Sequence, residues 1–251
     1  MLRTLDEMSG YRIQATDGEM GNVEDFLFDD ATWTIRYFVV DTGPWLFGRK
    51  VLISPQAVGE PSWEGRVLPV DLTKEQVEES PDIDLEEPVS RRKEEELHAH
   101  YGWQAYWATV PFGARVGTLA HTPEGAPMVA GDLPEDDDVH GDPHLRSVDE
   151  VVGYRLQALE GEIGHVDDFI ADDEAWAIRY MVVNTGNWLT GREVLIAPQW
   201  IDGINWEHAD VQLHLHKRDI KESPPYEAAM PLSREYESDL HDHYGMKGYW
   251  A

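Results

Sequence analysis

The sequence has 251 residues and a formal net charge of −29 at pH 7. A chain this acidic repels phosphate backbones and anionic lipid headgroups, so we expect no direct binding to nucleic acid. Hydrophobic residues make up 41% of the chain, which is enough for ordinary cores, and the absence of cysteine excludes disulfides, thiolate metal sites and a cysteine nucleophile.

Five short strands are predicted near the start of the chain from alternating apolar residues and intervening turn signals. They cover residues 11–15, 20–28, 33–41, 50–53 and 68–72. Gly21 inside the second strand predicts a bulge or a close backbone approach. The third strand is apolar on both faces near its end, which predicts a central, covered position. Short antiparallel strands with tight turns favour a small barrel, because closure removes exposed edges.

Two helices are predicted after these strands. Residues 73–76 have the spacing of a capping box, and Pro81 ends that short helix. Ser90 can cap a second helix, and Gly102 can stop it. An aromatic tail, Tyr106-Trp107, follows. We expect this tail to pack the helix onto a barrel.

Residues 109–147 differ in composition from what precedes them. They contain several prolines and glycines and the acidic run Glu135 to Asp138. This composition predicts an extended acidic linker.

The rest of the chain repeats the first part. Gly10-Tyr11-Arg12-Ile13-Gln14-Ala15 recurs as Gly153-Tyr154-Arg155-Leu156-Gln157-Ala158, 143 residues later. The same offset relates Trp33 to Trp176 and Trp107 to Trp250. A period this long indicates duplicated domains. We therefore predict a mainly β chain with domains at 1–108 and 148–251, each a small antiparallel barrel followed by short helices, joined by the linker at 109–147.

Several motifs resemble the PRC-barrel family. In the first copy they are Asp17-Gly18-Glu19-Met20-Gly21, Val23-Glu24-Asp25-Phe26, the strand 35–41 and Gly48-Arg49-Lys50-Val51-Leu52-Ile53. In the second copy they are Gly161 and Gly164, Val166-Asp167-Asp168-Phe169, the strand 178–183 and Gly191-Arg192-Glu193-Val194-Leu195-Ile196. The resemblance implies a protein-contacting module that is usually non-catalytic.

The family includes the cytoplasmic part of the photosynthetic reaction centre H subunit and a ribosome-maturation factor. The chain shows neither the N-terminal membrane helix of the former nor the N-terminal domain of the latter. The resemblance therefore implies only the protein-contacting module, and not the specific role of either of these proteins.

Arginines and a polar residue surround the loop after the central strand. They are Arg36, Asp41 and Arg49 in the first copy, and Arg179, Asn184 and Arg192 in the second. One interpretation is a polar site with Arg49 and Arg192 in contact with a partner. The other is that these residues order the loop. An acid replaced by an amide cannot act as the same general base in both copies.

Trp45 and Trp188 lie in glycine-flanked loops of the two copies. They are candidate anchors for a protein partner, because Trp is enriched at interface hot spots. The alternative is that they plug the mouth of each barrel.

Histidine pairs end each copy, His98 with His100 and His241 with His243. Side chains two residues apart on a helix point in different directions, so such a pair does not share a metal easily. His241 and His243 remain weak metal candidates, and no cofactor is expected.

The function predicted from these observations is a non-enzymatic interaction or assembly module with two barrels. The alternatives are a peripheral, H-subunit-like component of a photosynthetic or membrane complex, and a stress protein that binds metal or a small ligand. We expect a protein partner, cytoplasmic location, no membrane insertion, and either a homo-oligomer or packing of the two barrels within one chain.

Overall fold

The computed structural model describes residues 1–83, 85, 88–108, 144–186, 191–228 and 232–251. The chain divides into two compact units, one made of Met1–Lys74 with His144–Ala251 and the other of Glu75–Pro143. These units do not follow the repeat, because strands are exchanged between the two copies. The domain boundaries at 108 and 148 therefore stay a prediction, and most of the predicted linker, 109–143, lies outside the described residues.

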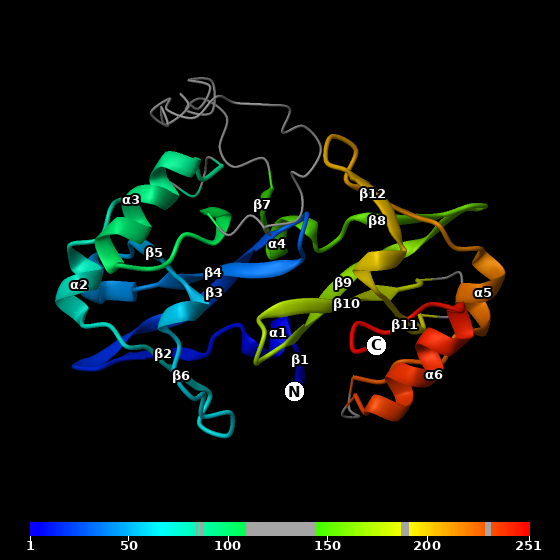
Figure 1. Ribbon diagram of the computed structural model, residues 1–251, viewed down its shortest axis with the longest axis horizontal. Helices are drawn as coiled ribbons and strands as arrows, with labels where there is room; N and C mark the ends of the chain where they lie inside the picture. The colour runs from blue at the N-terminus through cyan, green and yellow to red at the C-terminus, as the bar shows by residue number, and fades with distance from the viewer. Residues whose placement is uncertain (84, 86–87, 109–143, 187–190, 229–231) are drawn as a thin grey trace, which may run out of the picture. The chain divides into compact units, whose positions relative to one another are not determined.

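The first unit is mainly β, as predicted (Figure 1). Its strands in the first repeat are β1 (Leu2–Thr4), β2 (Arg12–Ala15), β3 (Gly18–Asp29), β4 (Thr34–Asp41), β5 (Lys50–Ile53) and β6 (Val67–Pro69). Those in the second are β7 (Leu145–Ser147), β8 (Arg155–Ala158), β9 (Gly161–Asp172), β10 (Ala177–Asn184), β11 (Glu193–Ile196), β12 (Ile201–Asn205) and β13 (Asp210–Leu213). The five predicted strands correspond to β2 through β6; β1 and β7 were not predicted.

Six short α-helices accompany the strands in the described residues. They are α1 (Leu5–Met8), α2 (Lys74–Glu78), α3 (Arg91–Tyr101), α4 (Val148–Val151), α5 (Lys217–Glu222) and α6 (Arg234–Tyr244). The predicted caps are confirmed: Ser90 accepts from the N–H of Lys93, and Gly102 ends α3 in the left-handed conformation. No helix in the described part of the chain has both the length and the apolar content to cross a membrane.

The strands form one mixed sheet with the order β12-β13-β8-β9-β10-β4-β3-β2-β6. The prediction of wholly antiparallel strands is wrong for two pairs, because β2–β6 and β8–β13 are parallel. The last strand of each repeat returns beside the first one and runs in the same direction. The strand order runs from β12 to β6 without these two strands pairing with each other. The sheet is therefore not closed, and the two predicted barrels are not shown.

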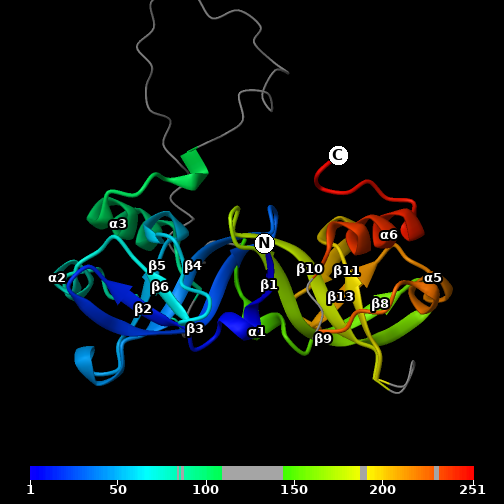
Figure 2. The ribbon, with the colours of Figure 1, turned by 90° about the horizontal axis from the view of Figure 1, so that it is seen from below.

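The two repeats exchange their first strands (Figures 1 and 2). β1 pairs with β9, so that Leu2 lies opposite Asp172. β7 pairs with β3, so that Leu145 lies opposite Asp29. These two pairings are equivalent, because the offset of 143 residues relates Leu2 to Leu145 and Asp29 to Asp172. Each repeat therefore depends on the other for one strand of its sheet.

Equivalent residues of the two repeats meet where β4 contacts β10, in the middle of Figure 2. Thr34 lies opposite Ala177. The N–H of Ile35 donates to the carbonyl of Trp176 at 2.7 Å, and the N–H of Ile178 donates to the carbonyl of Trp33 at 2.8 Å. The two bonds are reciprocal, so a local pseudo-twofold axis passes between these strands.

Aromatic side chains join the two repeats beside this axis. The rings of Phe28 and Phe169 lie 5.9 Å apart, and those of Phe38 and Trp176 lie 4.8 Å apart with an edge-to-face angle. Residues 37–40 of β4 are all buried, which confirms the central, covered strand predicted from its apolar faces. The hydrophobic core is therefore continuous between the repeats.

Gly21 and its counterpart Gly164 occupy positions that exclude a side chain. Their φ values are 156° and 150°. A Cβ atom would clash with the carbonyl oxygen of Asp41 at Gly21 and of Asn184 at Gly164. The close backbone approach predicted at Gly21 is confirmed.

Candidate functional site

The loop after β4 holds the first predicted contact residue, Trp45, in a short 3₁₀ turn (Gly43–Leu46). Its ring is half-buried, and the Lys74 ammonium lies 4.4 Å from the ring centroid. The neighbouring Phe47 is 98% exposed and has a φ of 57°. Phe47, which the sequence analysis did not single out, is therefore the side chain that this loop presents to solvent.

The second predicted tryptophan, Trp188, lies outside the described residues. Arg192, on the far side of its loop, donates to the carbonyl of Lys221 at 3.1 Å and to the carbonyl of Ser223. These bonds hold the Arg192 side chain against the end of α5. The carbonyls of Arg192 and of Arg49 each accept a bond from a threonine hydroxyl at 2.6 Å. The backbone of both arginines is therefore tied to the residue that directly follows β10 or β4.

The arginines at the start of the central strands form different contacts. Arg36 donates to Asp29 at 2.8 Å, whereas Asp41, at the other end of β4, accepts from the N–H of Gly43. In the second repeat, Asn184 accepts from Gly186 in the same way. Acid and amide can perform this turn-forming role equally well, which favours the loop-ordering interpretation over a polar site.

His241 and His243 lie on different sides of α6. His241 is 2% exposed, and its Nδ1 lies 3.1 Å from the carbonyl oxygen of Lys247. Nε2 of His243 lies 2.7 Å from the carbonyl oxygen of Asp219. Among the described residues, no three metal-ligating side chains come together.

A buried polar cluster surrounds Glu237 on α6, and the sequence analysis missed it. Glu237 is 2% exposed and accepts from the hydroxyls of Tyr180 at 3.0 Å and Tyr249 at 2.9 Å. Arg234 pairs with its other oxygen at 3.1 Å. Burial raises the pKa of Tyr180 and lowers that of His241, whose Nε2 lies 3.1 Å from the Tyr180 hydroxyl. Burial therefore favours the neutral form of each side chain.

The same arrangement recurs around Glu94 in the second unit. Tyr106 donates to Glu94 at 2.6 Å, and Arg91 pairs with Glu94 at 3.0 Å. Each of these residues lies 143 positions before its counterpart. The signal that could have revealed the cluster is the repeated spacing of Arg, Glu and Tyr.

A cavity of about 360 Å³ adjoins the Glu237 cluster. Its lining residues are Ala31, Thr32, Trp33, Ile178, Arg179, Ala197, Pro198, Gln199, His241 and Tyr249. Trp33 comes from the first repeat, and the guanidinium of Arg179 lies 4.1 Å from the ring of Tyr249. The hydroxyl of Tyr249 is already bonded to Glu237, and Arg179 already pairs with Asp172. The cavity offers neither an unpaired nucleophile nor an assembled acid–base pair.

Half-buried carboxylates contact the residues that follow the exchanged strands. Asp168 accepts from the N–H of Asp6 at 3.1 Å, in the first turn of α1. Asp25 accepts from the N–H of Asp149 at 3.1 Å and from the Ser147 hydroxyl at 2.6 Å, at the start of α4. Burial raises the pKa of Asp168 to about 6 and also raises that of Asp25. Each repeat thus supplies a carboxylate acceptor for a first-turn N–H of the first helix of the other repeat, while Thr4 and Ser147 are the N-caps of these helices.

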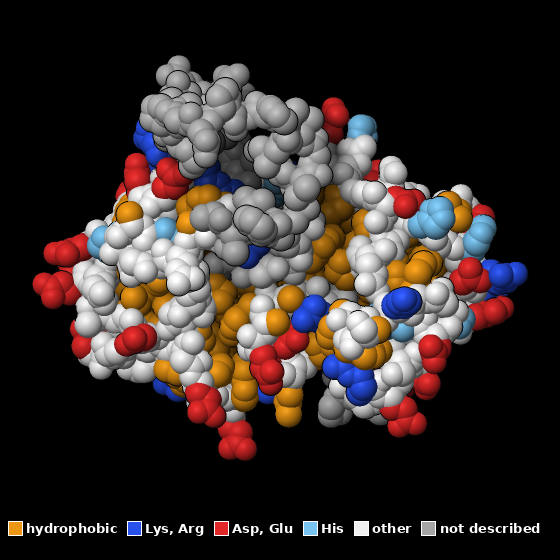
Figure 3. Space-filling model, viewed as in Figure 1, with side chains coloured by type: hydrophobic (Ala, Val, Ile, Leu, Met, Phe, Trp, Pro, Cys, Tyr) orange, Lys and Arg blue, Asp and Glu red, His pale blue; other side chains and the backbone are white. Residues whose placement is uncertain are grey.

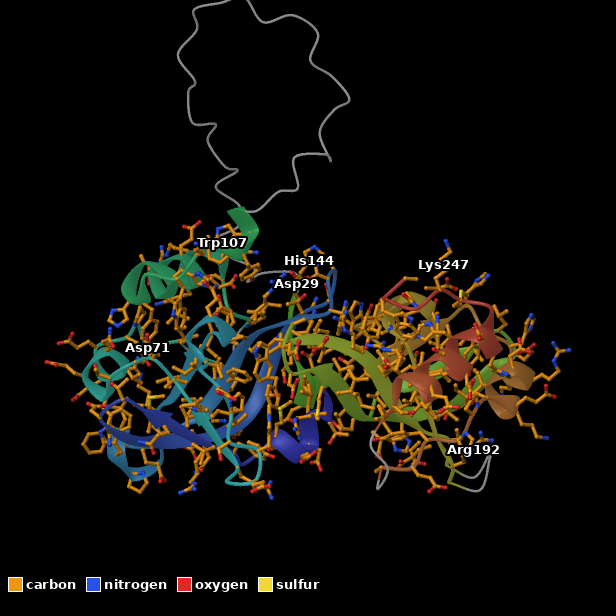
Figure 4. All side chains as sticks on the ribbon, turned by 60° about the horizontal axis from the view of Figure 1, so that its bottom comes forward. Asp29, Asp71, Trp107, His144, Arg192 and Lys247 are labelled. Atoms are coloured by element: carbon orange, nitrogen blue, oxygen red, sulfur yellow. The ribbon has the colours of Figure 1, made fainter. Side chains whose placement is uncertain are left out.

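Charged side chains are unevenly distributed on the face seen in Figure 3. Acidic groups lie mainly toward its periphery, and hydrophobic side chains gather over the middle, where the long strands of the two repeats meet. Figure 4 shows His144, which leads into β7, beside the end of β3 at Asp29. The Nδ1 of His144 lies 2.7 Å from a carboxylate oxygen of Asp30.

Comparison with known families identifies residues 3–77 as a PRC-barrel domain. The matched region begins in β1 and ends in α2. It therefore contains the strand that the first repeat donates to the second. No curated protein matches the chain.

Proposed function

We propose that the chain is a non-enzymatic interaction and assembly module with two PRC-type barrels. In this proposal, residues 148–251 form a second barrel that pairs with the matched domain about the local pseudo-twofold axis. Strand exchange holds the two barrels in a fixed arrangement. The chain can then present two similar surfaces to a partner, and binding at both raises the overall affinity through effective concentration.

The observation that carries the contact role is the exposed Phe47 of the first repeat; the second repeat has threonine, Thr190, at the equivalent position. A fully exposed aromatic side chain adds nothing to the core, and a left-handed φ costs a non-glycine residue on the order of 1 kcal/mol. Glycine or asparagine would suit the backbone better. A phenylalanine at such a position supports a role in contact with another protein.

The test is photocrosslinking in native cells with benzoylphenylalanine in place of Phe47. We expect one dominant protein adduct that disappears when excess wild-type chain is added as a competitor. The same photoreactive residue at Leu159, which is 52% exposed in the turn before β9, is the matched control. Absence of an adduct specific to position 47 would count against the contact role.

Bivalency has its own readout. Native mass spectrometry of the captured complex should give two partner molecules per chain. A strict one-to-one complex would remove the bivalent part of the proposal and leave the contact role of Phe47 intact.

A further inference from the structure

Strand β12 ends the sheet. It pairs with β13 on one side, and no other strand of the described residues pairs with its outer edge. An unpaired edge presents backbone N–H and C=O groups that can bind another extended chain.

The equivalent segment of the first repeat indicates which backbone N–H and C=O groups of β12 point away from β13. There, Ser62 and Val67 exchange two backbone hydrogen bonds, at 2.9 and 3.1 Å. Their counterparts Asn205 and Asp210 lie opposite each other in β12 and β13. Because bonded and non-bonded pairs alternate along antiparallel strands, the N–H and C=O of the adjacent Ile204 are directed to the outer edge.

The first repeat carries Pro61 at the position of Ile204. Proline has no N–H to offer, and it is one of the ways in which proteins protect an edge. In place of a strand, residues 58–62 form isolated bridges from Val58 to Val70 and from Ser62 to Val67. One repeat therefore has a blocked edge at this position, and the other has an open one.

The open edge borders a cavity of about 260 Å³. Its lining residues are Asp30, Trp33, Pro198, Ile201, Asp202, Gly203, Ile204 and Trp206. Trp33 belongs to the first repeat and is half-buried, whereas its counterpart Trp176 is only 9% exposed. The cavity thus combines a strand edge with two tryptophans.

We propose that β12 binds an extended, basic segment of a partner protein, which adds to the sheet as a further strand. Backbone bonds form at Ile204, and an apolar side chain of the segment fills the space between Trp33 and Trp206. Asp30 and Asp202 line the cavity. Asp30 already pairs with His144 and Arg146, so the carboxylate that favours a basic segment is Asp202, which is about half exposed. The net charge of −29 likewise favours a basic segment. This inference rests on the proposed interaction role and assigns it a second surface, distinct from Phe47.

The probe is a dye-labelled seven-residue peptide that alternates valine with arginine, tested with the full chain by fluorescence anisotropy at about 0.15 M salt. We expect Ile204→Pro to weaken binding about tenfold, since it removes the outward N–H at a position where the first repeat tolerates proline. Ile204→Val, which keeps the backbone N–H and an apolar side chain, is the matched control and should leave binding unchanged.

A second measurement keeps the test valid if Ile204→Pro fails to fold. The same peptide with alternate backbone nitrogens methylated keeps its charge but cannot form strand bonds. We expect it to bind about tenfold more weakly to the wild-type chain. Equal binding of the two peptides would mean that charge alone attracts them, and it would overturn the proposal.

The two proposals can fail independently. Loss of the crosslink at position 47 with retained peptide binding at β12 would remove the first contact surface only. Unchanged peptide binding in a folded Ile204→Pro variant would overturn the β12 proposal, whatever happens at Phe47.

Discussion

Thr34 and Ala177, which occupy equivalent positions in the two repeats, lie directly opposite each other where β4 meets β10. A pairing between equivalent residues is the signature of a twofold interface between identical subunits. Here both partners belong to one chain. The exchanged strands add two further pairings between the repeats, β1 with β9 and β7 with β3. The contact between the repeats therefore includes backbone hydrogen bonds as well as packed side chains.

Asp168→Asn should make the protein more stable at neutral pH. The folded-state pKa of Asp168, about 6, lies above its ordinary value of 3.8 because the carboxylate is buried. A group with a raised pKa contributes most to stability below pH 3.8, and that contribution is lost as the pH rises through 6. We expect the variant to gain about 2–3 kcal/mol in the free energy of unfolding at pH 7.5, and much less at pH 4.

Urea unfolding at the two pH values measures this effect. Asp167→Asn is the matched control. This substitution removes the same charge from the neighbouring Asp167, whose side chain is about 43% exposed. If Asp168→Asn lowered stability at pH 7.5, the bonds of the charged carboxylate to the N–H groups of Asp6 and Phe169 would outweigh its burial.

Gly164→Ala should destabilise the fold by about 2–3 kcal/mol, since the added methyl group meets the backbone of Asn184 at a φ that favours glycine. Thermal unfolding measures the loss. Gly203→Ala, in a strand with open space around the glycine, should change stability by less than about 0.5 kcal/mol. Similar losses in the two variants would contradict the close-approach explanation.

Glu237→Ala should cost about 3 kcal/mol, because it leaves the hydroxyls of Tyr180 and Tyr249 and the guanidinium of Arg234 without their shared acceptor. Glu235→Ala, on the exposed side of the same helix, is the control and should be nearly neutral. Chemical unfolding of both variants gives the comparison. A small effect at Glu237 would indicate that water replaces the carboxylate in the cluster.

Cutting the chain between residues 109 and 143, at an inserted protease site, should leave the two halves associated. Each half contributes a strand to the sheet of the other, so separation would break both strand pairs and expose the shared aromatic core. Size-exclusion chromatography with light scattering at about 1 μM measures the result, with the uncut chain as reference. Halves that elute separately would show that the exchange contributes little to their association.

The sequence predicted the local elements well and the connections between the repeats poorly. Alternating residues and glycine turns identified β2 through β6, and Ser90 with Gly102 marked the ends of α3, because these signals depend on a few neighbouring residues. β1 and β7 have three residues each, which is too few to show the alternation of apolar and polar residues that identifies a strand. Their partner strands, β9 and β3, lie far away in the sequence, and a pattern of neighbouring residues cannot predict such long-range pairing.

The predicted contact residues show the same limit. Trp45 was correctly placed in a loop, but its exposure relative to Phe47 depends on the left-handed turn at Phe47 and on the contact between Trp45 and Lys74. His241 was considered as a metal ligand, whereas the fold buries it beside Tyr180. Burial and partner choice arise from tertiary packing, which composition and spacing do not reveal.

The exchange of first strands also affects synthesis of the protein. β1 is synthesised before its partner β9, which ends at Asp172, roughly 170 residues later. At typical elongation rates this delay is on the order of 10–30 s. During that time the N-terminal half of a nascent chain has an incomplete sheet with an exposed edge. The order in which the strands are made therefore leaves these edges open to aggregation or to chaperones until β7 and β9 have emerged.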